Sequence, residues 1–385
     1  MNRDIQRDAL LPAAFSDFRA TRRIEALELR DIGPSLICRW QTLAAHSAEP
    51  NPFFEPWMLI PALRAFPKPG AVKVLAYYDG DVLSGLIPVS TPKLYYGRPI
   101  PHWASWLHDN VFCGVPLVLP GSEKAFLAAL LEWMQTRYSY GLFLHLSHIP
   151  QDGPFYTALR QQCGDHGLTA AVVHREKRAM LKSSQRPEEY YAASLSCKKR
   201  KELRRLANRL GEQGAVSFSR HGDADRLTEW TAQFLALEAE GWKGRDGSAL
   251  ASDAANKTFF EQTLTGAAKA NRLERLTLSL DQRPIAMLVN FITPPGAYSF
   301  KTTFDENYAR YSPGVLLQRE NLDLLSNKTV EWTDSCAAAD HPMIERIWRE
   351  KRSMVKVNIG IGGAVRHTMF RQMIRCEASA HLLGT

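Results

Sequence analysis

The sequence has no long hydrophobic run, and this absence limits the class of protein. No stretch approaches the roughly 18 consecutive apolar residues of a membrane-spanning helix. The N-terminal stretch MNRDIQRDALLPAAF mixes charges along its length and lacks the apolar core of a signal peptide. We therefore expect a cytoplasmic protein without a transmembrane segment, and the composition leaves peripheral contact with a membrane open.

Cysteines are few and scattered. The six are Cys38, Cys113, Cys163, Cys197, Cys336 and Cys376. No two of them form a C-x-x-C motif, and no histidine stands beside one at the spacing of zinc ligands. We expect reduced thiols, without a disulfide framework and without a metal site.

The glycine motifs of two large nucleotide-binding classes are also absent. The chain has no lysine-containing P-loop and no G-x-G-x-x-G fingerprint, which disfavours nucleotide hydrolysis and hydride transfer. A late glycine cluster, Gly360–Gly363, lacks a clear strand-then-helix pattern around it. We interpret that cluster as a turn.

What the chain has is a globular composition with an excess of positive charge. Its 385 residues are 45% hydrophobic and 23% charged, which fits two domains, and the net charge of +8 favours an anionic partner. Much of the excess lies in Lys198–Arg209, a predicted amphipathic helix that begins after Ser196 and ends at Gly211. A solvated helix face and a binding surface both remain open. Because no aromatic residues interleave with these charges, we expect no specific nucleic acid partner.

A weak internal repeat suggests the domain organisation. Phe53–Glu55 and Phe259–Glu261 each open a predicted helix, and roughly twenty residues later each is followed by a predicted hairpin. The first hairpin turns at Asp79-Gly80 and the second near Asp281-Gln282. The sequence therefore predicts a mixed α/β (α+β) protein of two tandem, related halves, residues 1–180 and 181–385, each with a mostly antiparallel sheet flanked by helices.

The most informative segment is Ser299–Leu317, SFKTTFDENYARYSPGVLL. It reads as the end of a strand, a polar connection and a helix start, with Ser312 as N-cap and Pro313 at the first helical position. Backbone N–H groups from Gly314 onward would then face outward, as at helix starts that bind phosphate. An ordinary capped helix is the alternative.

Three stretches together resemble a known family. FKTTFDENYARYSPGVLL, LEAEGWKGRDGSAL (Leu237–Leu250) and LSCKKRKELRRL are similar to the BioF2-like or cellulose-biosynthesis CelD-like acyltransferases of the GNAT superfamily. These are related to the tandem-GNAT FemAB-type aminoacyltransferases. The resemblance implies direct transfer of an acyl group, such as acetyl from acetyl-CoA or another acyl-CoA, to an amine or hydroxyl. The acceptor would be a small metabolite or a saccharide precursor.

The resemblance also implies where the coenzyme would bind. GNAT enzymes hold its pyrophosphate at a helix start marked [QR]-x-x-G-x-[GA], and the matching residues here are Arg310–Val315. Proline and valine replace small residues of that pattern, which removes one amide donor. The residues predicted to bind the coenzyme are Arg310, Ser312, Gly314, Val315 and Leu316.

Acyl transfer needs a proton acceptor and a donor for the developing negative charge. Glu238, near the end of a predicted helix, and Asp305, after a predicted strand, are candidate bases, although a surface position and a turn cap are their ordinary roles. Lys301 interrupts an aromatic strand, and either catalysis or pairing with a carboxylate explains it equally well. Tyr308 is a candidate acid for the departing thiolate, with core packing as the alternative.

Candidate substrate-binding residues flank these positions. Trp242 and Lys243 form a loop with one aromatic surface and a cation, and Asp334 ends a predicted strand, where an Asx turn is the alternative. His341 is expected to lie just before a predicted helix, Pro342–Arg352, and Cys336 is expected to be an unreactive thiol, because no activating triad surrounds it. The sequence after about residue 370 shows little pattern.

Two other functions remain open. An aminoacyl-tRNA-dependent FemAB-type transferase would suit the tandem halves and the basic helix. A non-catalytic component of exopolysaccharide assembly would keep the fold without turnover.

Overall fold

The computed structural model describes residues 22–66, 72–137, 141–339, 341, 343–377 and 381–383. The N-terminal stretch compared with a signal peptide, and Pro342, lie outside these residues. In the described part of the chain, no helix is long and apolar enough to cross a membrane.

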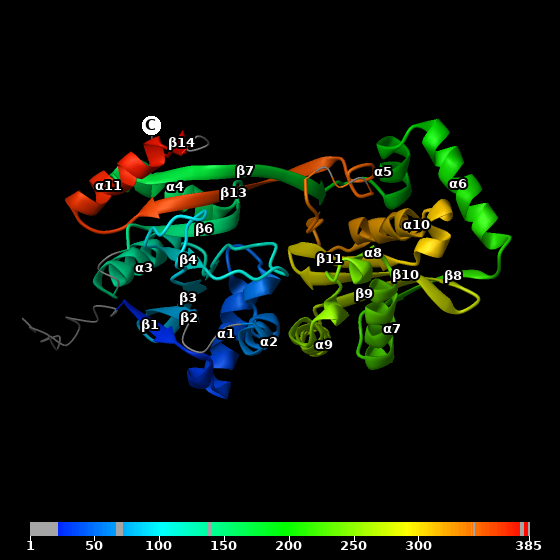
Figure 1. Cartoon of the computed structure of the whole chain (residues 1–385), viewed down its shortest axis with the longest axis horizontal. Helices are drawn as coiled ribbons and strands as arrows, with labels where there is room; N and C mark the ends of the chain where they lie inside the picture. Colours follow the sequence, from blue (N-terminus) through cyan, green and yellow to red (C-terminus); the bar gives the residue numbers. More distant parts are fainter. Residues whose placement is uncertain are drawn as a thin grey trace, which may run out of the picture.

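The first part of the chain alternates helices with a sheet (Figure 1). Its elements are β1 (Arg23–Leu27), α1 (Pro34–His46), α2 (Pro56–Ala65), β2 (Val72–Asp79), β3 (Val82–Ser90), β4 (Trp103–Ser105), β5 (Leu117–Val118), α3 (Glu123–Arg137), β6 (Phe143–Pro150), α4 (Pro154–His166) and β7 (Ala170–Leu181). The β2–β3 hairpin turns at Gly80, as predicted.

The second part repeats much of this order. Its elements are α5 (Pro187–Ser194), α6 (Cys197–Gly211), β8 (Val216–His221), α7 (Leu227–Glu240), α8 (Trp242–Arg245), α9 (Ala254–Lys269), β9 (Leu273–Leu280), β10 (Arg283–Thr293), β11 (Gly296–Phe304), α10 (Pro313–Glu320), β12 (Trp332–Asp334), β13 (Glu350–Gly360), α11 (Ala364–Arg375) and β14 (His381–Leu382). The β9–β10 hairpin turns at Asp281-Gln282, again as predicted.

The described strands form one sheet, and its two parts have similar strand arrangements. Its main path runs β1-β2-β3-β4-β6-β13-β7-β12-β11-β10-β9-β8. Pairing is antiparallel except at two places, β4 with β6 and β11 with β12. Each half therefore contains a hairpin followed by one parallel pair, and the predicted fold class, a mixed α/β protein of two related halves, is confirmed.

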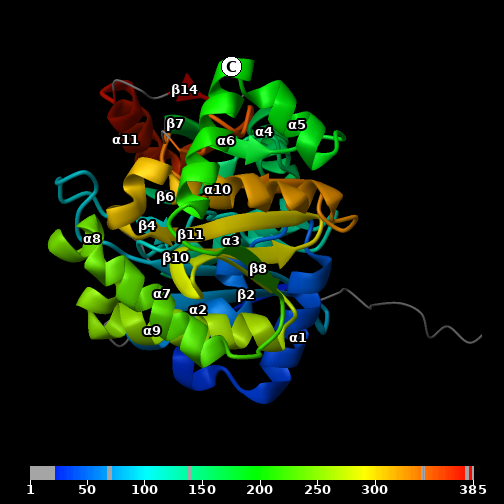
Figure 2. The same ribbon diagram turned by 90° about the vertical axis from the view of Figure 1, so that its right-hand side faces the viewer.

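Two long strands cross from one half to the other. β7 pairs with β13 along its length and with β12 at its end, and β13 also pairs with β6. Figure 1 shows both strands running across the top of the molecule. In Figure 2 the sheet of the second half lies between α10 on one side and α7 and α9 on the other.

The two halves share one hydrophobic core. Phe53 of the first half is fully buried and packs edge-on against Tyr298 of β11, with ring centroids 5.4 Å apart. Helices α2 and α9 pack so closely that a Cβ on Gly266 would lie 2.9 Å from the Cβ of Trp57. Substituting Gly266 would therefore push these helices apart.

Some sequence predictions differ from the structure. Phe259–Glu261 lies inside α9 rather than at its start. The predicted helix Pro342–Arg352 is wrong: the described residues there form turns and then β13, a mostly buried strand that pairs with β6 on one edge and with β7 on the other. Of the predicted turn Gly360–Gly363, Gly360 instead ends β13, and the next three residues form a bend that joins this strand to α11.

Candidate active site

The candidate site is a fork between two parallel strands. β11 pairs with β12 only from Gly296 to Tyr298, and β11 then continues alone on that edge to Phe304. A bulge opposite Val289/Asn290 places Phe300 between two ladder partners and bends β11 at this point. A cavity of about 580 Å³ lies in the fork, lined by β11 on one side and by Ser335–Ala338 on the other.

The cavity brings together six of the residues predicted from sequence. Its lining includes Trp242, Lys243, Lys301, Ser312, Gly314 and Val315. The other predicted residues, Glu238, Asp305, Tyr308, Arg310, Leu316 and Asp334, are not among its lining residues.

The start of α10 forms one end of the cavity. Ser312 has a left-handed backbone (φ 57°), and its carbonyl accepts the N–H groups of Val315 and Leu316 at 3.0 and 3.1 Å. Those two amides are therefore already paired, whereas the Gly314 N–H has no partner among the described residues. A Cβ on Gly314 would lie 2.7 Å from the Met343 sulfur. Glycine thus keeps this end of the cavity open.

The two remaining coenzyme candidates lie away from the cavity. Arg310 is exposed, with its guanidinium 4.7 Å from the centre of the Tyr311 ring. Leu316 is buried in the apolar cluster between α10 and the sheet. Arg310 could reach a ligand only by leaving Tyr311, and Leu316 packs against the core.

Lys301 projects from β11 among aromatic rings. Its Nζ lies 5.6 and 5.8 Å from the ring centres of Phe300 and Phe112. No carboxylate among the described residues forms an ion pair with it. Burial, and then the repulsion of Lys243, lower the pKa of Lys301 to about 8. A useful fraction of Lys301 is therefore neutral near physiological pH.

Glu238 stands behind the cavity wall. It is 2% exposed, accepts a hydrogen bond from the Lys243 ammonium at 2.7 Å, and accepts the Leu250 N–H at 2.8 Å. Lys243 itself lines the cavity from α8, beside the exposed Trp242. The carboxylate therefore reaches the cavity only through Lys243.

Asp305 and Tyr308 occupy the turn that follows β11. Asp305 is 5% exposed, accepts the Asn307 N–H at 2.9 Å, and pairs with Arg283 at 3.3 Å. Tyr308 is partly buried against the cluster that contains Tyr311. Capping and packing account for these contacts, and the chemical roles predicted for both residues stay predictions.

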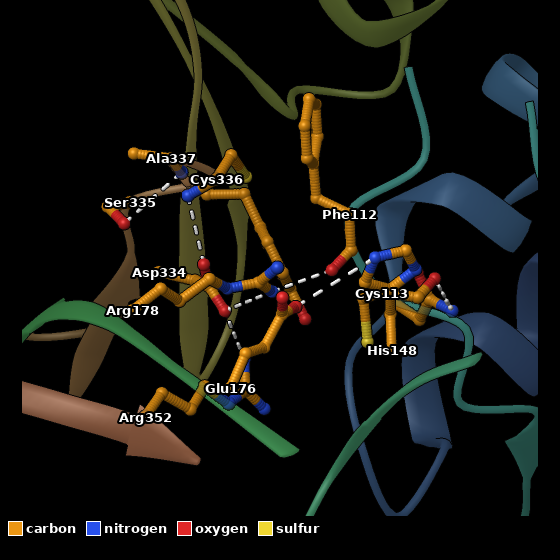
Figure 3. Close-up of polar contacts among 12 residues, drawn as sticks. Phe112, Cys113, His148, Glu176, Arg178, Asp334, Ser335, Cys336, Ala337 and Arg352 are labelled. Atoms are coloured by element: carbon orange, nitrogen blue, oxygen red, sulfur yellow. Dashed lines mark hydrogen bonds and ion pairs between the residues drawn. The ribbon is translucent and has the colours of Figure 1, made fainter. Parts of the chain in front are cut away.

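Asp334 forms the centre of a buried ion cluster (Figure 3). Its Oδ2 accepts hydrogen bonds from Arg178 at 2.7 Å and Arg352 at 3.0 Å, and its Oδ1 accepts the Cys336 N–H at 2.9 Å. Burial alone would raise the pKa of Asp334, but the two guanidiniums outweigh it and hold that pKa below its ordinary value. Since Arg178 also donates to the Phe112 carbonyl at 2.6 Å, the cluster ties β12, β7 and β13 to the cavity wall.

Several lining residues gave no usable signal in the sequence. Phe112 comes from a loop of the first half, and Met343 and Arg346 come from turns before β13. Cys336 also lines the cavity, with φ 52°, but burial and the charge of Asp334 raise the pKa of its thiol, which disfavours a nucleophilic role. Only the pairing of the two halves, which no local motif encodes, brings Phe112 to this place.

Comparisons with known proteins agree with this geometry. Residues 197–342 match the model of the acetyltransferase (GNAT) domain. No curated protein matches the sequence.

Many solved structures have a similar fold, and three of them are compared with this chain below. FemX shares 10% identity, with 91% of this chain and 99% of that chain covered and a TM-score of 0.54. The C-terminal domain of a putative lysylphosphatidylglycerol synthetase from Agrobacterium fabrum shares 12% identity, with 89% and 97% covered and a TM-score of 0.52. A conserved protein of unknown function from Bacteroides thetaiotaomicron shares 11%, with 84% and 97% covered and a TM-score of 0.55.

Residues 197–342, which include both strands of the fork, match the GNAT acetyltransferase domain, and the whole chain has a fold similar to that of FemX. At these identities the structural similarities show the fold alone.

Proposed function

We propose that this protein is an acyltransferase that uses acyl-CoA, such as acetyl-CoA, and transfers the acyl group directly to an amine or hydroxyl. The observation that carries the proposal is the cavity in the β11–β12 fork, with the Lys301 side chain on its wall and the Gly314 amide at one end, neither of them paired with another described residue. In this proposal residues 181–385 form the coenzyme side and residues 1–180 the acceptor side, without a metal.

The donor would lie along the unpaired edge of β11. That edge offers backbone groups from Ser299 to Thr302, all of which line the cavity. A phosphate at the start of α10 would meet the Gly314 amide and the positive end of the helix dipole. Phe300 and Phe304 supply apolar surface between these polar ends.

Lys301 is the residue best placed to accept a proton. With a pKa of about 8, roughly a tenth of its side chains are neutral at pH 7. A neutral Lys301 takes the proton from the acceptor amine or hydroxyl while the acceptor's nitrogen or oxygen bonds to the acyl carbon. The bond from that carbon to sulfur breaks, and coenzyme A leaves as its thiolate. The Lys243 ammonium, held by Glu238, faces the same cavity and stabilises negative charge that develops there.

Replacing Gly314 with valine is expected to weaken acetyl-CoA binding about tenfold or more, because the branched side chain occupies the space beside Met343 and covers the free amide. Isothermal titration calorimetry with acetyl-CoA measures the change. Gly211→Val is the matched control, since a Cβ there meets nothing within 4 Å. Unchanged affinity in Gly314→Val would show that this end of the cavity is not part of the coenzyme site. If the wild type does not bind acetyl-CoA, the proposal that acetyl-CoA is the acyl donor is wrong.

A second candidate is transfer from aminoacyl-tRNA, which the exposed basic side of α6 favours. Lys198 and Lys201 are exposed, and Lys199 pairs only within the helix, with Glu202. If tRNA is the donor, replacing Lys198, Lys199 and Lys201 with glutamine should weaken tRNA binding and flatten its salt dependence by about one unit of slope per lost phosphate contact. Filter binding across a salt series measures both, and salt-independent or absent binding excludes this donor.

The acceptor is proposed from the sequence resemblance. A saccharide precursor or small metabolite would enter beside Trp242, which is 54% exposed, lines the cavity and offers a ring for stacking. Coenzyme binding without turnover on a panel of amino sugars and amines would favour instead a non-catalytic component of exopolysaccharide assembly.

A further inference from the structure

A second surface, remote from the fork in the sheet, exposes apolar side chains on a rigid hairpin. Tyr95 and Arg98 exchange both backbone hydrogen bonds, at 2.8 and 3.0 Å, and the tip residues Tyr96 and Gly97 both have positive φ. Leu94 and Tyr96 are nevertheless 56% and 64% exposed. The Tyr96 ring touches that of Tyr95, with ring centroids 4.7 Å apart, but more than half of each of the two apolar residues remains open to solvent.

Helix α11 exposes a similar pair. Val365 and Met369 are 75% and 53% exposed and lie one helical turn apart, so they share one face. The opposite side of α11 is buried through Phe370 and Ile374. The helix is thus apolar on its inner side and keeps an apolar stripe on its outer side as well.

The hairpin and the helix are physically joined. The Tyr95 hydroxyl donates to Glu377, just after α11, at 2.8 Å, and it accepts a hydrogen bond from Asn358 of β13 at 2.7 Å. Tyr95 and Phe370 also pack against the same ring, that of Phe143. Residues 93–98 and 364–377 therefore form one fixed unit, here called the apolar-basic surface; Figure 1 shows α11 at one end of the molecule, near the C-terminus.

The charges of this surface are mostly positive. Its cations are Lys93, Arg98, Arg366, Arg371 and Arg375. Its one carboxylate, Glu377, is already occupied by the Tyr95 hydroxyl. Exposed aliphatic and aromatic side chains among unneutralised cations are the composition of proteins that rest on anionic lipid.

We propose that the apolar-basic surface docks this protein on the face of a membrane that contains anionic lipids. Tyr96 and Leu94 enter the interfacial region, where an aromatic ring with a polar tip is favoured. Val365 and Met369 extend the buried apolar area along α11, and the arginines meet lipid phosphates. Because the hairpin is already rigid, little conformational entropy is lost on binding.

Vesicle flotation with the full chain tests this proposal. The protein is expected to float with phosphatidylcholine vesicles that contain roughly one third phosphatidylglycerol, and to stay behind with phosphatidylcholine alone or in high salt. Leu94→Ser combined with Tyr96→Asn should reduce binding about tenfold, asparagine being a residue that tolerates positive φ. Arg371→Gln with Arg375→Gln should give a loss of about the same size.

Val82→Ser is the matched control, because Val82 is 57% exposed on the separate β2–β3 hairpin. It should leave flotation unchanged. The proposal is overturned if the wild type does not bind anionic vesicles, if it binds neutral ones equally well, or if the hairpin variant binds like the control. Sedimentation without lipid tests whether a second copy of the chain covers this surface instead. A dimer of the wild type that is lost in the hairpin variant would assign the surface to self-association, and would also overturn the proposal.

Discussion

Asp334→Asn is expected to lower the free energy of unfolding by about 3–5 kcal/mol, because it leaves the Arg178 and Arg352 guanidiniums buried without a counter-ion. The three side chains are 0%, 3% and 6% exposed, so water cannot replace the lost carboxylate. Urea unfolding followed by circular dichroism measures the loss. The same variant should also weaken acetyl-CoA binding, since Asp334 holds the Cys336 N–H at the cavity wall.

Asp323→Asn is the control for this effect. Asp323 also pairs with an arginine, Arg220, at 3.4 Å, but its side chain is 57% exposed, so its loss should cost less than about 1 kcal/mol. An equally small cost for Asp334→Asn would contradict the assignment of the buried cluster as a joint between β12, β7 and β13.

The pH dependence of the Asp334 contribution follows from the direction of its shift. The folded protein lowers the pKa of Asp334, so this contribution is fully present above the ordinary carboxyl pKa and is lost as the pH falls through the lower folded-state value. The difference between wild type and Asp334→Asn should therefore be constant near neutral pH and shrink only in strong acid.

Local patterns in the sequence predicted the parts of the fold that depend on neighbouring residues. The two hairpins turn at Asp79-Gly80 and Asp281-Gln282, and α6 begins after Ser196, whose hydroxyl accepts the Lys199 N–H at 3.2 Å. Alternation, turn residues and caps act within a few positions of the chain, so one sequence suffices to find them.

The C-terminal part of the chain could not be predicted in this way. The predicted helix Pro342–Arg352 took in the first residues of β13, because the partners of this strand, β6 and β7, lie roughly two hundred residues earlier and give no local signal. The sequence after about residue 370 showed little pattern, although α11 buries Phe370 and Ile374 against that sheet. Both elements depend on contacts between distant parts of the chain, which local sequence propensities do not reveal.

For the candidate site as well, the sequence predicted the residues that local patterns mark and missed those that depend on distant contacts. Lys301 and Gly314 stood out because a lysine within an aromatic strand and a glycine after Ser-Pro each need a local explanation, and both line the cavity. Asp334 also stood out, but its two arginines come from distant strands, and only the structure shows that they enclose it. Phe112 was not found, since its place depends on how the halves meet.

Lys301→Met should separate stability from activity. At pH 7 the Lys301 ammonium of the wild type is mostly charged and lies among the Phe112 and Phe300 rings, where burying the charge destabilises the fold. Methionine fills similar space without a charge and so removes this destabilisation. We expect the variant to be more stable by about 1–3 kcal/mol. If Lys301 is the base, kcat/KM should nevertheless fall about 100-fold or more, measured by thiol release from acetyl-CoA with an acceptor found by screening amines. The exposed Lys257→Met should change neither quantity.

The pH profiles test the same assignment independently. The folded-state pKa of Lys301, about 8, is below the ordinary value of 10.5, so the folded protein binds fewer protons and the stabilisation by methionine should fade as the pH rises from about 8 to 10.5. A neutral Lys301 as base predicts that wild-type kcat/KM rises with pH to a plateau above about 8, and that Lys301→Met lacks this rise. Activity that falls through pH 8 would show instead that the charged form is required, and would make Lys301 an electrostatic donor rather than the base.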